Sequence, residues 1–68
     1  MKVNKRIVLG YVERFEEAKK IQLEVLNVIE QNYIEVSTVI EVAKGFLIVA
    51  MYGTQEELNK LMNLLGIY

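Results

Sequence analysis

Two adjacent segments of the chain space their apolar residues differently, and this difference limits the folds that the chain can adopt. Residues 33–43 alternate between apolar and polar positions, which is typical of a strand buried on one face. Residues 46–52 are nearly all apolar, so a strand there needs cover on both faces. Lys44-Gly45 supplies a two-residue turn between them, because glycine adopts positive φ without strain. The pattern predicts a β-hairpin whose second strand is central in its sheet.

Residues 3–12 predict another strand, because they are rich in β-branched and aliphatic residues. Regular alternation places Ile7, Leu9 and Tyr11 on one face, and Val8 and Val12 on the other. From about Glu13 the period becomes helical. The apolar stripe of that helix consists of Phe15, Ala18, Ile21, Val25, Val28 and Ile29, with Leu26 at its margin and Leu23 on the polar side.

A second helix is predicted after the hairpin. Thr54 and Glu57 have the Thr-x-x-Glu spacing of a capping box, in which each side chain satisfies a backbone N–H at the helix start. The apolar stripe that follows contains Leu58, Leu61, Met62 and Leu65. Gly66 is expected to end this helix. Ile67-Tyr68 is too short to assign and could add only a stub of a fourth strand.

The element order is therefore β-α-β-β-α in a single domain spanning residues 1–68. This is the α+β, ferredoxin-like split βαβ arrangement with its last strand short or missing. We expect an antiparallel sheet of strand order 2-3-1 with both helices on one face. The first helix is expected to make a right-handed crossover. This crossover predicts that strand 3–12 lies beside strand 46–52 and runs parallel to it.

One face of this sheet is expected to lack helical cover. A two-residue turn at Lys44-Gly45 sets Val42 opposite Leu47, which assigns Val36, Thr38, Ile40, Val42, Leu47, Val49 and Met51 to the face under the helices. The other face then carries Val39, Ala43, Phe46, Ile48, Ala50 and Tyr52, mixed with Glu35, Ser37 and Glu41. A one-residue slip in the turn would exchange the faces. A contiguous apolar patch on a small protein usually marks an interaction site, and the outer edge of residues 3–12 is a second attachment point.

Size and charge limit the possible functions. A chain of 68 residues buries only about 60% of its unfolded surface, so a second chain would add useful stability. The eight basic and nine acidic residues give a net charge of −1, which offers no electrostatic footprint for nucleic acid or an anionic membrane. The longest apolar run, residues 46–52, is far shorter than the roughly 20 residues of a membrane-spanning helix. We expect a cytoplasmic protein without membrane association.

The side chains used in catalysis are almost absent. The chain has no His, Cys or Asp, and its one serine is Ser37, so no nucleophile has a visible base and no thiolate metal site exists. The glutamate pairs at 16–17 and 56–57 lie in first turns of the predicted helices, where negative charge favours the helix dipole. Gly10 and Gly53 are solitary, so no phosphate-binding loop is indicated. The sequence predicts neither enzymatic activity nor a cofactor.

A short stretch of the sequence and the chain as a whole each resemble a known protein family, and each resemblance implies a function. Residues 44–49, Lys-Gly-Phe-Leu-Ile-Val, resemble the third-strand signature of RNA-recognition motifs. In this chain Ile48 and Met51 replace aromatic residues of that signature, and Val8 stands where the first strand would carry a stacking ring. Base stacking therefore has few of its usual side chains.

The chain as a whole resembles ACT-like regulatory domains, in particular the small stand-alone iron-only hydrogenase system regulators. The resemblance covers residues 5–66. It is carried by Lys5-Arg6-Ile7-Val8, Glu16-Glu17-Ala18-Lys19-Lys20, the alternating strand, and Gly53-Thr54-Gln55-Glu56-Glu57-Leu58. It implies a domain that pairs with another copy through strands or helices. Residues 12–15, Val-Glu-Arg-Phe, replace the Asp and Pro-Gly of the usual ACT ligand loop, so the resemblance leaves a small-molecule ligand open.

These observations predict a homodimeric, non-enzymatic regulatory or protein-interaction module. Its contacts are expected on the uncovered sheet face, through Val39, Phe46, Ile48, Ala50 and Tyr52, with Val8 or Tyr11 added from the first strand. Two alternatives remain. The same face, or the first-strand edge, could bind a different protein, as a small inhibitor would. The third-strand signature could instead indicate an RNA-binding module.

Overall fold

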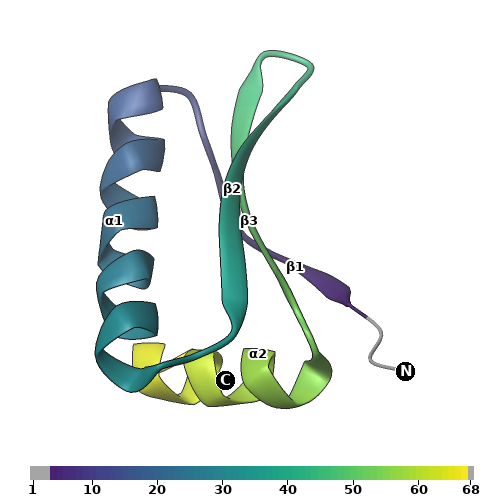
Figure 1. The fold of residues 1–68 in the computed structure, drawn as a ribbon. Coiled ribbons are helices and arrows are strands. Elements are labelled where there is room, and N and C mark those ends of the chain that lie inside the picture. The colour runs from purple at the N-terminus through teal and green to yellow at the C-terminus, as the bar shows by residue number, and fades with distance from the viewer. Residues whose placement is uncertain (1–3, 68) are drawn as a thin grey trace.

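The computed structural model describes residues 4–67, which form three strands and two helices in the predicted order (Figure 1). The elements are β1 (Lys5–Val12), α1 (Phe15–Asn32), β2 (Val36–Ala43), β3 (Phe46–Gly53) and α2 (Gln55–Leu65). The expected start of the first strand at Val3 lies outside the described residues. So does Tyr68, while Ile67 belongs to no strand.

The sheet has the order β1-β3-β2, which confirms the predicted arrangement around a central third strand. Both pairs are antiparallel. The prediction of parallel first and third strands is therefore wrong. The crossover through α1 joins β1 to β2, and those two strands run in the same direction with β3 inserted between them. The two-residue turn between β2 and β3 makes those strands antiparallel, and β3 is therefore antiparallel to β1 as well.

The β2–β3 turn has the predicted two-residue form. Lys44 and Gly45 have φ values of 45° and 83°, as a type I′ turn requires at both central positions. Val42 lies opposite Leu47, and Ile40 lies opposite Val49. The predicted hairpin register is confirmed, and the assignment of β2 and β3 residues to the two faces follows from it.

A β-bulge at Leu9 changes the predicted faces of β1. Val8 pairs with Ala50 and Gly10 pairs with Val49, so Leu9 is an extra residue in β1. An extra residue reverses the alternation beyond it. Val8 and Tyr11 therefore share one face, while Val12 joins the opposite face, and the predicted separation of Val8 from Tyr11 is wrong.

The hydrophobic core lies between the helices and one face of the sheet. The cluster of buried side chains contains Val25 and Ile29 from α1, Leu58 and Leu61 from α2, Val36 from β2, Met51 from β3, and Ile34 from the loop before β2. Ile7 and Leu9 of β1 pack against its margin. Both helices thus cover the Met51 face, and among residues 4–67 no helix covers the face that carries Tyr52 and Ala50.

The helix ends explain where β2 begins. Tyr33 takes a left-handed conformation after α1, and Ile34 N donates to Ile29 O at 3.1 Å, which caps that helix. Glu35 N donates to the Glu57 carboxylate at 3.1 Å. The strand therefore starts at Val36 and not at Tyr33, because these residues cap α1 and attach the loop to α2.

The second helix begins and ends where the sequence predicts. Thr54 Oγ1 accepts from Glu57 N at 3.3 Å, which is one half of the predicted capping box. Gly66 has a φ of 77° and closes the helix, with Ile67 N donating to Met62 O at 2.9 Å. The Glu57 side chain also binds Lys60 at 2.9 Å, so it connects the first turn of α2 with the next turn and with the loop before β2.

Candidate interaction surface on the open face of the sheet

The sheet face turned away from the helices, here called the open face, carries three cross-strand rows of side chains. The rows are Arg6–Tyr52–Ser37, Val8–Ala50–Val39 and Tyr11–Ile48–Glu41. Phe46 and Ala43 extend this face toward the β2–β3 turn. All seven predicted contact residues therefore lie on one face: Val8, Tyr11, Val39, Phe46, Ile48, Ala50 and Tyr52.

Their exposure differs sharply along this face. Ala50 is fully buried and Ile48 is 7% exposed, although no described helix covers them. Val8, Val39 and Tyr52 are half-buried, whereas Tyr11 is 66% exposed and Phe46 is 47% exposed. Ile48 and Ala50 therefore expose almost no surface in the single chain, and their predicted part in a contact stays a prediction. The accessible surface of this face belongs to the neighbouring residues that are half-buried or exposed.

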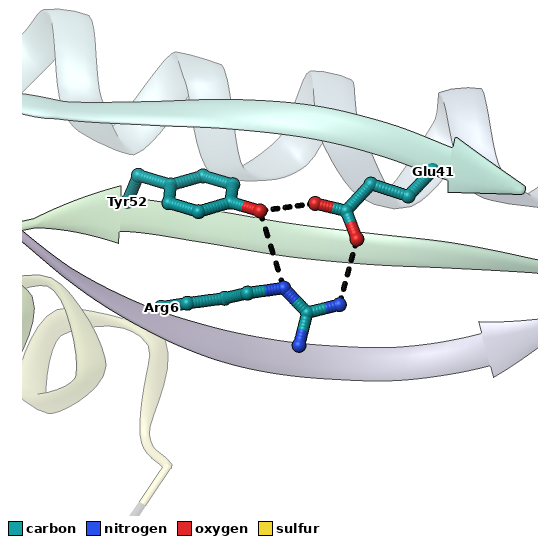
Figure 2. A network of polar contacts seen from close by, with 3 residues as sticks. All are labelled: Arg6, Glu41 and Tyr52. Atoms are coloured by element: carbon teal, nitrogen blue, oxygen red, sulfur yellow. Dashed lines mark hydrogen bonds and ion pairs between the residues drawn. The ribbon is translucent and has the colours of Figure 1, made fainter.

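A polar network spans the middle row of this face. Figure 2 shows Arg6 of β1, Tyr52 of β3 and Glu41 of β2 pointing toward one another on the side of the sheet away from the helix. Arg6 Nη2 donates to Glu41 Oε1 at 2.6 Å, Arg6 Nε donates to Tyr52 Oη at 3.2 Å, and the Tyr52 hydroxyl donates to Glu41 Oε2. The network connects the first and third rows across the middle row, where Ala50 is buried between Val8 and Val39.

The network also shifts two ionisation equilibria. The hydrogen bond from Arg6, together with that from Tyr52, lowers the pKa of Glu41 below its usual value. The hydrogen bond to Glu41, followed by that to Tyr52, raises the pKa of Arg6 further above its usual range. Both groups therefore stay charged at neutral pH. The side chains are 42% and 31% exposed, so the pair remains in contact with solvent.

The open face consequently has two halves. The half toward α2 is polar, with Arg6, Ser37 and the phenol of Tyr52. The half toward the β2–β3 turn is mainly apolar, with Tyr11, Ala43 and Phe46 exposed around the buried Ile48. An apolar centre beside a charged rim is the usual composition of a protein–protein contact.

Two further exposed apolar residues were not predicted as surface. Val42 is 77% exposed and Phe15 is 56% exposed, although the sequence pattern assigns both to the buried side of their elements. Val42 lies on the same face as Met51, in the row Val12–Leu47–Val42 next to the turn. Helix α1 begins only at Phe15, so it leaves this last row incompletely covered. Periodicity identifies the face of a residue but not how far along the sheet a helix extends.

Away from the open face, the described residues offer a small hollow but no metal-binding cluster. Within residues 4–67 no group of three or more His, Cys, Asp or Glu side chains could hold a metal ion. A hollow of about 400 Å³ lies at the end remote from the turn, lined by Asn32, Ile34, Lys60, Asn63 and Leu64. Lys60, the residue that brings a positive charge to this hollow, pairs with Glu57, and the hydrogen bond between them raises the pKa of Lys60.

The fold and the surface define a class: a small α+β protein with a three-stranded antiparallel sheet, two helices on one face, and an exposed, partly apolar second face. In comparisons with protein-family models, with curated proteins and with solved structures, no match to this chain was found. Neither of the described helices is both long and apolar enough to cross a membrane.

Proposed function

We propose that this chain is a non-enzymatic, homodimeric regulatory or protein-interaction module of the ACT-like, ferredoxin-like type. The observation that carries the proposal is the apolar half of the open face, where Tyr11 and Phe46 are exposed on a sheet of only three described strands. A patch of this kind on a small soluble chain usually serves an interaction. The β-α-β-β-α order and the position of β3 between β1 and β2 support the ferredoxin-like assignment.

The open face is a better candidate than the outer edge of β1. An edge strand recruits another strand through regularly spaced backbone groups, and a β-bulge disturbs that spacing and twists the edge away. The bulge at Leu9 lies in the middle of β1. It weakens the edge as a template and, by turning Tyr11 toward Val8, adds an aromatic ring to the open face.

Protein binding also suits this face better than RNA binding. Tyr11, Phe46 and Tyr52 place three rings on it, which would favour base stacking. However, Glu41 lies in the same row as Tyr11, and Arg6, the cation nearest to it, is already neutralised by that carboxylate. A phosphate group crossing the row of Tyr11 would meet the Glu41 carboxylate, whose nearest cation, Arg6, is already paired with it.

The experiment is sedimentation equilibrium over a wide concentration range, combined with melting temperatures at the same concentrations. We expect a particle of twice the 7.9 kDa chain mass, and a melting temperature that rises with concentration, because association stabilises the folded state by mass action. Tyr11→Glu and Phe46→Glu should shift the protein to monomer, since a charge is costly in an apolar contact. Leu23→Glu is the matched control, because Leu23 is 58% exposed on the outer side of α1.

The buried members of the face make poor test positions. A glutamate at Ile48 or Ala50 would unfold the single chain whether or not a dimer forms, because both residues are buried within it. A wild-type protein that stays monomeric at high micromolar concentration would contradict the proposal. A fully dimeric Tyr11→Glu variant would contradict the assignment of the contact to this face.

A further inference from the structure

Four exposed apolar side chains lie at the end of the molecule where the β2–β3 turn and the start of α1 are found. We call them the hairpin-end patch: Tyr11, Phe15, Val42 and Phe46, which are 66%, 56%, 77% and 47% exposed. Figure 1 shows the turn and the first turn of α1 at the same end. Tyr11 and Phe46 belong to the open face, whereas Val42 belongs to the opposite face and Phe15 opens α1. The patch therefore continues around the end of the sheet from one face to the other.

The chain leaves this end uncovered because its helices cover the sheet elsewhere. Helix α2 follows β3 at the opposite end, and its buried residues Leu58 and Leu61 pack with Met51 and Val36. Val12 and Leu47, the row partners of Val42, are only half-buried. An apolar row that its own helices leave partly exposed is a surface for another chain to cover.

The exposed area decides how large a contact this patch supports. A Phe or Tyr side chain offers about 150–250 Å², so three half-exposed rings and Val42 leave on the order of 400 Å² of apolar surface. A stable homodimer buries about 800 Å² per partner, of which about two thirds, or roughly 500 Å², is apolar. The open-face residues alone fall short of this value. The hairpin-end patch together with the half-buried Val8 and Val39 reaches it.

The charged residues around the patch indicate which kind of chain binds it. The charged residues next to its members are Glu13 and Arg14 before α1, Glu16 and Glu17 in the first turn, Lys19, whose Nζ lies 5.8 Å from the centre of the Phe15 ring, and Lys44 in the β2–β3 turn, all of them exposed. A strongly basic or acidic partner would find no matching field in this mixture of three cations and three anions. A two-fold dimer sets the same surface against itself, and a mixed rim tolerates this because opposite charges can pair.

From this area and this charge pattern we infer that a second copy of this chain docks on the hairpin-end patch, burying Phe15 and Val42 together with the open-face rings Tyr11 and Phe46. The inference rests on the proposed function, because it specifies where on the chain the homodimer contact is centred. It adds a contact on the helix side of the sheet that the open face alone does not include.

The first test uses the two helix-side members of the patch. We expect Val42→Glu and Phe15→Glu each to raise the dimer dissociation constant about tenfold or more, which corresponds to the loss of one substantial interface residue. Leu23→Glu, at a similarly exposed Leu on the outer side of α1, should leave it unchanged. Circular dichroism melts below the dissociation constant confirm that each variant still folds.

A second measurement does not depend on weakening the dimer. The chain has no cysteine, so Glu13→Cys, at an exposed position beside the patch, introduces a single attachment point for a spin label. In double electron–electron resonance, the labelled Glu13→Cys protein should give a short, narrow distance distribution between the two copies. Leu23→Cys should give a longer one, because it lies away from the proposed contact.

The outcomes separate this inference from the proposed function. A wild-type monomer overturns both. A dimer that Tyr11→Glu dissociates, but that Val42→Glu and Phe15→Glu leave intact, overturns only the inference and keeps the open face as the contact. A monomer whose hairpin-end patch binds phosphatidylserine vesicles, with binding lost in Val42→Glu, overturns the second copy as the occupant.

Discussion

Arg6 and Glu41 form an ion pair at 2.6 Å although the central strand β3 separates the strands that carry them (Figure 2). Tyr52 of β3 completes the connection, because it accepts from Arg6 and donates to Glu41. Exposed ion pairs usually contribute little to stability. Together with Tyr52, this pair connects all three strands on the face without helices. We therefore expect it to contribute more to the free energy of unfolding than an isolated surface pair does.

The network predicts a specific pH dependence of folding. The pKa of Glu41 is lowered in the folded chain, so its contribution to the free energy of unfolding is complete above the unfolded-state pKa and is lost as the pH falls through the folded value. Wild type should therefore be more stable than Glu41→Gln at pH 7, and the difference should shrink as the pH falls below about 4. Urea unfolding at pH 7, 5 and 3 measures this difference.

Two controls define the effect. Glu24→Gln, at an exposed position on α1, should unfold like wild type at each pH. Arg6→Gln combined with Glu41→Gln should lose little more stability than either single change, because the partners act as one unit. A wild-type advantage over Glu41→Gln that stays constant down to pH 3 would show that the pair does not stabilise the sheet through its charge.

Backbone conformation predicts opposite effects of alanine at Gly45, in the β2–β3 turn, and at Gly10, in β1. Gly45 has a φ of 83°, so Gly45→Ala should lower the free energy of unfolding by about 1 kcal/mol through left-handed strain. Gly10 lies outside the left-handed region, and a Cβ there would meet no heavy atom within 4 Å. Gly10→Ala should be neutral or stabilise by up to about 1 kcal/mol, because alanine restricts the unfolded chain. Urea unfolding of both variants checks the contrast, and equal losses would argue against a type I′ turn at residues 44–45.

The features predicted from sequence are those that depend on local chemistry. Lys44-Gly45 determines the turn and, through it, the register of Val42 against Leu47, because a two-residue loop leaves no freedom in pairing. The Thr54 cap and the Gly66 stop determine the bounds of α2 in the same way. Given this register, alternation is sufficient to place the predicted β2 and β3 site residues on one face.

The features that were missed depend on contacts between distant segments. Gly10, next to Leu9, is a local signal, because an isolated glycine within a strand often marks a bulge. The position of the extra residue, however, is defined only by its pairing with β3. The network across the row of Ala50 joins Arg6 and Glu41, which lie 35 positions apart in the chain. The exposure of Val42 depends on where α1 begins relative to the hairpin. Sequence alone therefore identifies the face of the candidate site but not which of its residues remain accessible.

A buried hydroxyl predicts a stabilising substitution on the covered face. Thr38 Oγ1 is buried and has no hydrogen-bond partner among the described residues, and its row partners are Ile7 and Met51. Thr38→Val keeps the shape and removes an unsatisfied polar group, so it should raise the free energy of unfolding by about 1 kcal/mol. Ser37→Val, on the exposed side of the same strand, is the control and should change it by less than about 0.5 kcal/mol. A destabilised Thr38→Val would indicate that a water molecule or another partner satisfies the hydroxyl in solution.

The end of α1 predicts a gain in stability from replacing a large residue with a small one. Tyr33 caps the helix with φ and ψ of 53° and 47°, and its side chain is 92% exposed, so it carries left-handed strain with almost no packing in return. Tyr33→Gly should raise the free energy of unfolding by about 0.5–1 kcal/mol, because the relief of strain exceeds the extra entropy of the unfolded glycine. Gln31→Gly, two residues earlier and inside the helix, should lower it by about 1 kcal/mol. Urea midpoints that move in opposite directions would therefore locate the helix end between these positions, whereas a loss of stability in both variants would mean that the helix continues through Tyr33.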